Sequence, residues 1–238
     1  MRLSTGRSES KPNMSPGKID DAVQRLEQNL PLRRNQLCLP ESLRQLHRSI
    51  LRYYLENGRA PGAAEIGYAG DLKSALQRLA VEKVIVLGQS AAITGAYPFV
   101  DEAREFKVVS DYGASYAMCA FDALAISSMF ELPTRIESRC RISGCCIVID
   151  QNGDSLQVVE PDLPVFGAIN WDARDSAQSC SASLCSEMMF IVGDDNAKRW
   201  REQNPASREL FTLDEAHEFI TAVFLPLMQP GQVGEKSA

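Results

Sequence analysis

The sequence has no hydrophobic run long enough to cross a bilayer, which takes about 20 consecutive apolar residues. Basic residues do not predominate, because 25 lysines and arginines stand against 31 acidic residues and the formal net charge is −6. A general nucleic-acid-binding protein would be basic. Residues 1–17 are rich in Ser, Lys and Pro and lack the apolar segment of a signal peptide. These absences predict a cytoplasmic protein with a disordered N-terminal tail over residues 1–17, no membrane contact and no nucleic-acid partner.

Motifs of the common catalytic and metal-binding sites are also missing. No glycine-rich phosphate loop, Ser/His/Asp signature, CxxC pair or HxxxH pair occurs in the chain. The two histidines, His47 and His217, fall in predicted helices far along the sequence from the cysteines, so a zinc site has little support. Cysteine, by contrast, is present seven times. An odd number without an export signal predicts free thiols or metal ligands rather than a disulfide framework.

The hydrophobic pattern predicts two domains after the tail, over residues 18–100 and 101–230. In the first, apolar spacing and capping residues indicate helices over 19–30, 41–57 and 72–81, a short turn or helix at 63–67 and a two-stranded wing over 84–97. This order is that of a winged helix. The helix over 72–81 would then either read DNA or belong to a structural domain that reuses the shape. Its only cations are Lys73, Arg78 and the trailing Lys83, which favours the structural interpretation.

The second domain is predicted to be an antiparallel meander with helices packed on it. Alternation and turn signals indicate strands over 106–109, 134–140, 146–149, 156–159, 165–169 and 184–192. Helices are predicted over 115–130, from Asp194 or Asp195 to Trp200, and from a capping box at Thr212 to Pro226. The expected fold class is therefore α+β, with an N-terminal winged-helix-like domain followed by an antiparallel sheet domain.

Cys119 and Asp122 form the most unusual pair in the sequence. A helix over 115–130 would place them three residues apart on one face, among neighbours that are almost all apolar. Burial would keep a proton on Asp122 near neutral pH, whereas a helix N-terminus would favour ionisation of the Cys119 thiol. The pair thus predicts a soft nucleophile beside a proton donor.

The remaining thiols differ in what their surroundings indicate. Cys185 precedes the apolar Met188–Val192 run, and a strand there would bring its thiol to the Cys119 helix. Cys180 lies in a Ser-rich loop and is a candidate auxiliary or substitute thiol. Cys140 ends a strand and is interpreted as structural. The last three, Cys38, Cys145 and Cys146, are interpreted as small buried hydrophobic residues.

Several segments together resemble one known family. The run Tyr116–Leu124 closely resembles the cysteine–aspartate helix of the organomercurial (alkylmercury) lyases. Ile93–Phe99 is similar to the segment that joins that family's winged-helix-like domain to its catalytic domain. Further similar segments are Ile136–Cys140, Leu184–Phe190 and Ala197–Trp200, so that the resemblance covers roughly residues 43–228.

The resemblance implies an enzyme that cleaves the carbon–mercury bond by protonolysis and yields a hydrocarbon and Hg²⁺. Cys119 and Cys185 would be the mercury-binding thiols, with Asp122 beside the metal as the proton-handling carboxyl, and Cys140 would be structural. No organic cofactor is implied. Small thiols or a mercuric reductase would accept the Hg²⁺. The chain departs from the family at Ser186, where a second cysteine is frequent.

The sequence is also compatible with two other functions. A thiol-based metal sensor would bind DNA through the winged helix, and the acidic charge balance counts against it. A lyase-like relative would only bind metal or would carry out other thiol chemistry. The joint presence of Cys119, Cys185 and Asp122 argues against this second alternative.

Overall fold

A computed structural model of the chain describes residues 17–173 and 183–229. Its helices are α1 (Lys18–Asn29), α2 (Leu32–Leu37), α3 (Glu41–Asn57), α4 (Leu72–Val81), α5 (Ala120–Phe130), α6 (Asp194–Glu202) and α7 (Leu213–Met228), and its short 3₁₀ helices are η1 (Ala63–Glu65), η2 (Trp171–Ala173) and η4 (Leu184–Glu187). Its strands are β1 (Ile85–Leu87), β2 (Ile93–Ala96), β3 (Phe99–Val100), β4 (Lys107–Ser110), β5 (Gly113–Ala117), β6 (Pro133–Arg139), β7 (Cys146–Asn152), β8 (Ser155–Glu160), β9 (Val165–Asn170), β10 (Met188–Val192) and β11 (Arg208–Thr212). No helix within these ranges is long and apolar enough to span a membrane.

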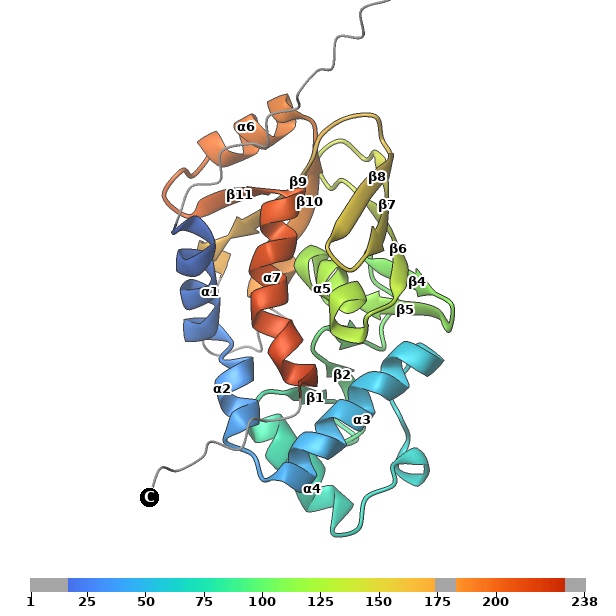
Figure 1. The fold of residues 1–238 in the computed structure, drawn as a ribbon. Helices are drawn as coiled ribbons and strands as arrows, with labels where there is room; N and C mark the ends of the chain where they lie inside the picture. The colour runs from blue at the N-terminus through green and yellow to red at the C-terminus, as the bar shows by residue number, and fades with distance from the viewer. Residues whose placement is uncertain (1–16, 174–182, 230–238) are drawn as a thin grey trace, which may run out of the picture.

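Two antiparallel sheets with helices packed around them make up the fold (Figure 1). The larger sheet has the strand order β1-β2-β3-β5-β4-β6-β7-β8, and the smaller has the order β10-β9-β11. Helix α7 packs against α5 on one side and against α1 and α2 on another. The expected α+β class is confirmed. The sheets are not one simple meander, because β3 pairs with β5 and because β9, β10 and β11 form a sheet of their own.

Local sequence signals set several element boundaries of the N-terminal region. Helix α3 ends at Gly58, which adopts the left-handed conformation with φ 67°. Asp71 caps α4, and its carboxylate accepts a hydrogen bond from the Ser74 N–H at 3.3 Å. The order α3, η1, α4 and the β1–β2 hairpin follows the predicted order, while the description as a winged helix stays a prediction.

The larger sheet continues across the predicted domain boundary at residue 100. Strand β2 pairs with β3 through Gly95 and Val100, and β3 pairs with β5 in the following region. Helix α3 also packs on β5, and the Tyr54 ring stacks on Phe99 with centroids 5.5 Å apart. The two predicted domains therefore share a sheet and a hydrophobic core, and their division remains a prediction.

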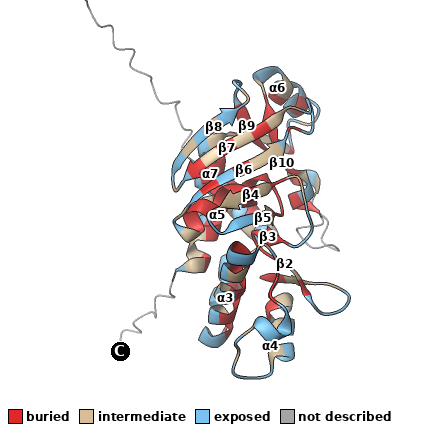
Figure 2. Cartoon of the chain, turned by 90° about the vertical axis from the view of Figure 1, so that its right-hand side faces the viewer, coloured by how far each residue is buried: buried red, intermediate tan, exposed pale blue. Residues whose placement is uncertain are grey.

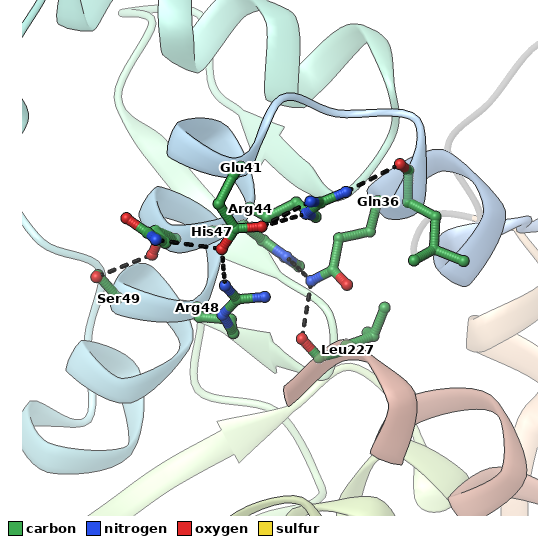
Figure 3. A network of polar contacts seen from close by, with 9 residues as sticks. Gln36, Glu41, Arg44, His47, Arg48, Ser49 and Leu227 are labelled. Carbon is green, nitrogen blue, oxygen red and sulfur yellow. Dashed lines mark hydrogen bonds and ion pairs between the residues drawn. The ribbon is translucent and has the colours of Figure 1, made fainter. Parts of the chain in front are cut away.

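A buried polar network joins α2, α3 and α7 (Figure 3). The Gln36 side-chain amide donates to the Leu227 carbonyl at 2.9 Å and lies 2.9 Å from Nδ1 of His47. Burial lowers the pKa of His47 to about 4, so the ring is neutral at pH 7. Helix α7 runs two residues past Pro226, and this network holds its last turn. His47 thus serves the packing of three helices.

Two predicted elements are wrong. Ser115–Ala117 belongs to strand β5, which pairs with β3 and β4, and the following helix begins only after Cys119. Leu184–Glu187 forms the 3₁₀ turn η4, so the predicted strand over 184–192 begins at Met188. In the first case, pairing with β3 and β4 overrides the local preference for a helix. Helix α6 is also capped by Gly193 rather than by an aspartate.

Candidate functional site

Cys119 lies at the junction of a strand and a helix. Strand β5 ends at Ala117, and Cys119 is the N-cap of α5 with an extended backbone. Its Sγ accepts a hydrogen bond from the Asp122 N–H at 3.4 Å, in the way that a serine oxygen would cap a helix. This local geometry places the Asp122 side chain beside the Cys119 thiol.

Helix α5 is enclosed by the rest of the molecule. Its residues from Ala120 to Met129 are all buried, and they pack against β6, β7, β10 and α7 (Figure 2). Phe121 contacts Phe211 and Phe219 with ring centroids 5.7 and 5.6 Å away. Phe121 thus lies in an aromatic cluster of the core. The start of the helix is held rigidly.

Cys185 reaches the same place from the smaller sheet. It lies in η4, directly before the fully buried strand β10, which pairs along its whole length with β9. Phe190 of that strand packs edge-on against Phe106, which precedes β4 of the larger sheet. The two sheets therefore meet next to η4 and bring Cys185 towards α5.

The structure brings the three predicted residues together. The two sulfur atoms and one carboxylate oxygen of Cys119, Cys185 and Asp122 all lie within 4.8 Å of one another. The exposed fractions of the three residues are 0%, 3% and 3%. Among the described residues, these three form the one group of at least three His, Cys, Asp or Glu side chains that lie close enough together to hold a metal ion. Its two thiols would suit a soft metal.

Asp122 is a buried carboxyl group that holds its proton near neutral pH. Burial raises its pKa to about 7, although a hydrogen bond with the Cys119 thiol and the charge of Arg104 act in the opposite direction. Its Oδ2 is buried and has no hydrogen-bond partner among the described residues. The predicted rise in the pKa of Asp122 is confirmed, and one carboxyl oxygen is left to carry a proton.

The predicted ionisation of Cys119 is wrong. Burial raises the pKa of its thiol to about 12, and the nearby carboxylate of Asp122 adds to the rise. The hydrogen bonds from Cys185 and from the Asp122 N–H act to lower the pKa but are outweighed. A helix N-terminus contributes at most about 2 kcal/mol, whereas removal of a thiolate from water costs more. The thiol is therefore protonated in the free protein.

The other cysteines lie apart from this cluster. Cys140 is buried, and its Sγ accepts hydrogen bonds from the N–H groups of Ser143 and Val192, both at 3.4 Å. Burial would raise its pKa, but the hydrogen bonds from Ser143 and the backbone outweigh burial and lower it. Cys145 and Cys146 are half-buried, and Cys38 is exposed at the end of α2, contrary to the prediction of a buried residue. Cys180 lies outside the described residues.

Met118, the residue before Cys119, and Arg104 line a cavity of about 290 Å³. The cavity also borders Thr94, Gly95 and Val100. Arg104 Nη1 donates to the Met118 carbonyl at 3.5 Å, and its charge lowers the pKa of Asp122. No sequence signal pointed to Arg104, because a single arginine in a loop has no distinguishing spacing.

The model of the family described as alkylmercury lyase matches residues 99–225, which is more than half of the chain and includes all three residues of the cluster. The chain belongs to the alkylmercury lyase family. Curated alkylmercury lyases of Bacillus cereus and Clostridium butyricum are both 28% identical to it over 103 residues, or 43% of this chain. The match spans about half the length (45%) of these relatives.

A solved structure has a similar fold. The crystal structure of the mercury-bound form of MerB2 superposes with a TM-score of 0.67, covering 88% of this chain and 100% of the other. The two sequences are 19% identical, so this likeness concerns the fold. The resemblance seen in the sequence is thus confirmed at the level of the family and of the architecture.

Proposed function

We propose that this protein is an organomercurial lyase, which cleaves a carbon–mercury bond by protonolysis to give a hydrocarbon and Hg²⁺. One observation carries the proposal: two thiols and a carboxyl group lie within 4.8 Å in a buried site, and one carboxyl oxygen has no partner among the described residues. The family of the chain supports the same assignment.

Mercury capture needs the two thiols. R–Hg⁺ is a soft electrophile that prefers sulfur to oxygen or nitrogen ligands. One thiol replaces the ligand that accompanies the organomercurial, and its proton leaves with that ligand. The second thiol then binds the same mercury and gives its proton to the Asp122 carboxylate. Two sulfur ligands raise the electron density at mercury and weaken the carbon–mercury bond.

Proton delivery needs Asp122. The departing carbon keeps the bonding electron pair, and protonation by Asp122 turns that pair into a carbon–hydrogen bond. A pKa of about 7 suits both steps, because the carboxylate can accept the thiol proton and the acid can release it to carbon. The Cys119 thiol already hydrogen-bonds to this carboxyl group. The products are the hydrocarbon and Hg²⁺ bound to Cys119 and Cys185, with Asp122 beside the metal.

The proposal includes the surroundings of the reaction. Small thiols or a mercuric reductase would take Hg²⁺ from Cys119 and Cys185, and no organic cofactor takes part. The chemistry requires reduced thiols, which fits the cytoplasm. The region over residues 18–100 would be a structural, winged-helix-like part without a nucleic-acid partner. Its α4 carries Arg78 in an ion pair with Glu82 at 2.8 Å, which lowers the positive charge that this helix presents.

The test follows benzene release from phenylmercury in excess small thiol under multiple-turnover conditions. We expect sustained release that disappears in Cys119→Ala and nearly disappears in Cys185→Ser, while Cys38→Ser, an exposed control, keeps full activity. Asp122→Ala should bind mercury but lose about 10²–10⁴-fold in cleavage rate. Mercury binding without benzene release by the unaltered protein would reduce it to a metal-binding relative. A fully active Cys185→Ser variant would mean that another cysteine supplies the second thiol.

A further inference from the structure

Arg141 holds the turn that carries Cys185. It lies in the loop after β6, and its Nη1 donates a hydrogen bond to the main-chain carbonyl of Ser186, the residue next to Cys185. The Nε and Nη2 atoms of the same guanidinium each lie 2.7 Å from one carboxylate oxygen of Glu105, Oε1. One arginine, whose side chain is 35% exposed, thus joins the Cys185 turn to the loop between β3 and β4.

Glu105 lies in the loop between β3 and β4, and this loop also contacts the segment that carries Cys119. Arg104, the residue before Glu105, donates to the Met118 carbonyl, and Met118 precedes Cys119. The charge of Arg104 also reaches Asp122. Neighbouring residues of one loop therefore act on both thiol-bearing segments, Arg104 directly and Glu105 through Arg141.

The loop that carries Arg141 is itself fixed to the smaller sheet. The Sγ of Cys140 accepts a hydrogen bond from the Val192 N–H at the end of β10, and the Cys140 carbonyl accepts one from the Gly144 N–H at 2.8 Å. The Cys140 N–H donates to the Cys145 carbonyl at 2.9 Å. The backbone next to Arg141 is therefore fixed by hydrogen bonds, and the guanidinium at the end of its side chain is fixed by Glu105 and by the Ser186 carbonyl.

The turn held by Arg141 has weak internal support. Residues Leu184–Glu187 form a single 3₁₀ turn, in which the Ser186 N–H and hydroxyl both donate to the Ser183 carbonyl, at 3.1 and 2.5 Å. Short 3₁₀ segments have poor hydrogen-bond geometry. A charge-assisted hydrogen bond to the Ser186 carbonyl is stronger than a neutral one, so it adds a restraint to the packing of this turn against β9, β10 and η2.

We propose that Arg141, oriented by Glu105, is a positioning residue that sets the Cys185 thiol against Cys119 and Asp122. The expected change in kcat rests on the proposed lyase function, whereas the expected change in the position of the Cys185 thiol does not. Capture of an organomercurial needs one sulfur, whereas cleavage needs both sulfurs on one mercury. Loss of Arg141 therefore lowers kcat more than it raises KM, since a displacement of about 1 Å can cost about 10²-fold.

The experiment compares Arg141→Ala, Arg141→Lys and Glu105→Gln with the unaltered protein. Arg135→Ala serves as the matched control, because Arg135 makes a two-contact ion pair with Asp150 at 2.6 and 2.8 Å on the same sheet. The first readout is the rate of Cys185 alkylation by iodoacetamide, followed by peptide mass spectrometry. The second is the kcat and KM for benzene release from phenylmercury.

We expect Arg141→Ala to raise the Cys185 alkylation rate by about tenfold and to lower kcat by about 10–10²-fold, with KM nearly unchanged. Arg141→Lys restores part of both, because an ammonium can reach the Ser186 carbonyl but cannot form the two-contact pair with Glu105. Arg135→Ala changes neither readout. Glu105→Gln gives a smaller change of the same kind, and it decides the question if Arg141→Ala does not fold.

Equal alkylation rates in Arg141→Ala and Arg135→Ala would overturn the proposal, as would equal losses of kcat. An unaltered protein that releases no benzene would instead contradict the lyase function. The alkylation rates would still decide the role of Arg141 in that case, because they report on the Cys185 turn without any turnover.

Discussion

Replacement of Asp122 by asparagine should stabilise the folded protein at neutral pH while it removes cleavage. Burial raises the pKa of Asp122 from 3.8 in an exposed group to about 7 in the folded protein. Between these two values the unfolded chain releases a proton that the folded protein keeps. The unaltered protein therefore loses stability as the pH rises through this window. Asparagine is neutral at every pH and carries no such penalty.

The size of the effect follows from the two pKa values. Each pH unit between them changes the free energy of unfolding by about 1.4 kcal/mol. The variant should match the unaltered protein near pH 4, gain stability over it with rising pH, and reach a constant advantage of about 4 kcal/mol above pH 7. The group is 3% exposed, so solvent screening takes little from this figure.

Urea unfolding of both proteins between about pH 4 and pH 8, with reductant present, measures the difference. Asp150→Asn is the control of opposite sign. The Arg135 guanidinium lowers the pKa of the exposed Asp150 carboxyl, so this variant should lose a little stability at neutral pH. An Asp122→Asn variant no more stable than the unaltered protein at pH 7, or a difference independent of pH, would refute the reasoning. Asp122 would then be an ionised and well-partnered group in the folded state.

Two further predictions concern the surroundings of Asp122. Because the pKa of Cys119 is raised from 9.0 to about 12, its alkylation at pH 8 should be about 10³-fold slower than that of the exposed Cys38. Peptide mass spectrometry measures both rates, and comparable rates in the folded protein would contradict the raised pKa. Gly167→Ala should lower the free energy of unfolding by about 1–3 kcal/mol, because the added Cβ would lie 2.8 Å from Phe121 and 2.9 Å from Ala216. An unchanged urea midpoint would mean that α5 can shift away from β9.

Local signals in the sequence predicted the ends of several elements. Asp71 caps α4, and the Thr212–Glu215 capping box opens α7 with both of its hydrogen bonds formed. The predicted hairpin at Asn152-Gly153 joins β7 and β8, and its two turn residues are Gly153, at φ 56°, and Asp154. Each of these features depends on side chain and backbone within four residues, which is why it can be read without the fold.

Pairing over long distances could not be read in the same way. The short strand β3 pairs with β2 and with β5, β5 pairs with both β3 and β4, and β11 pairs with β9 from almost forty residues away. Small residues such as Ala114, Ser115 and Ala117 fit a helix as well as a strand, and only the neighbouring strands decide between them. The separate smaller sheet was therefore beyond the local pattern.

The site shows the same division. Cys119 and Asp122 could be placed together because they lie three residues apart, whereas Cys185 came from the resemblance to the lyases and from its apolar neighbours. The pKa of Cys119 was predicted in the wrong direction because it depends on burial by residues of both sheets. Arg104 and Arg141 carried no signal, since each is a single arginine in a loop whose contacts exist only after folding.

The two thiols are carried by different sheets: Cys119 follows β5 of the larger sheet and Cys185 precedes β10 of the smaller one. A mercuric ion bonded to both sulfurs would be a cross-link between the sheets, comparable to a disulfide with one metal atom inserted. It would bind the two adjacent sulfurs of the folded protein more tightly than the separated cysteines of the unfolded chain, and would thus raise the melting temperature. The product would leave by ligand exchange, one sulfur at a time, because simple dissociation requires both bonds to break together. The concentration of external thiol would then set the turnover rate.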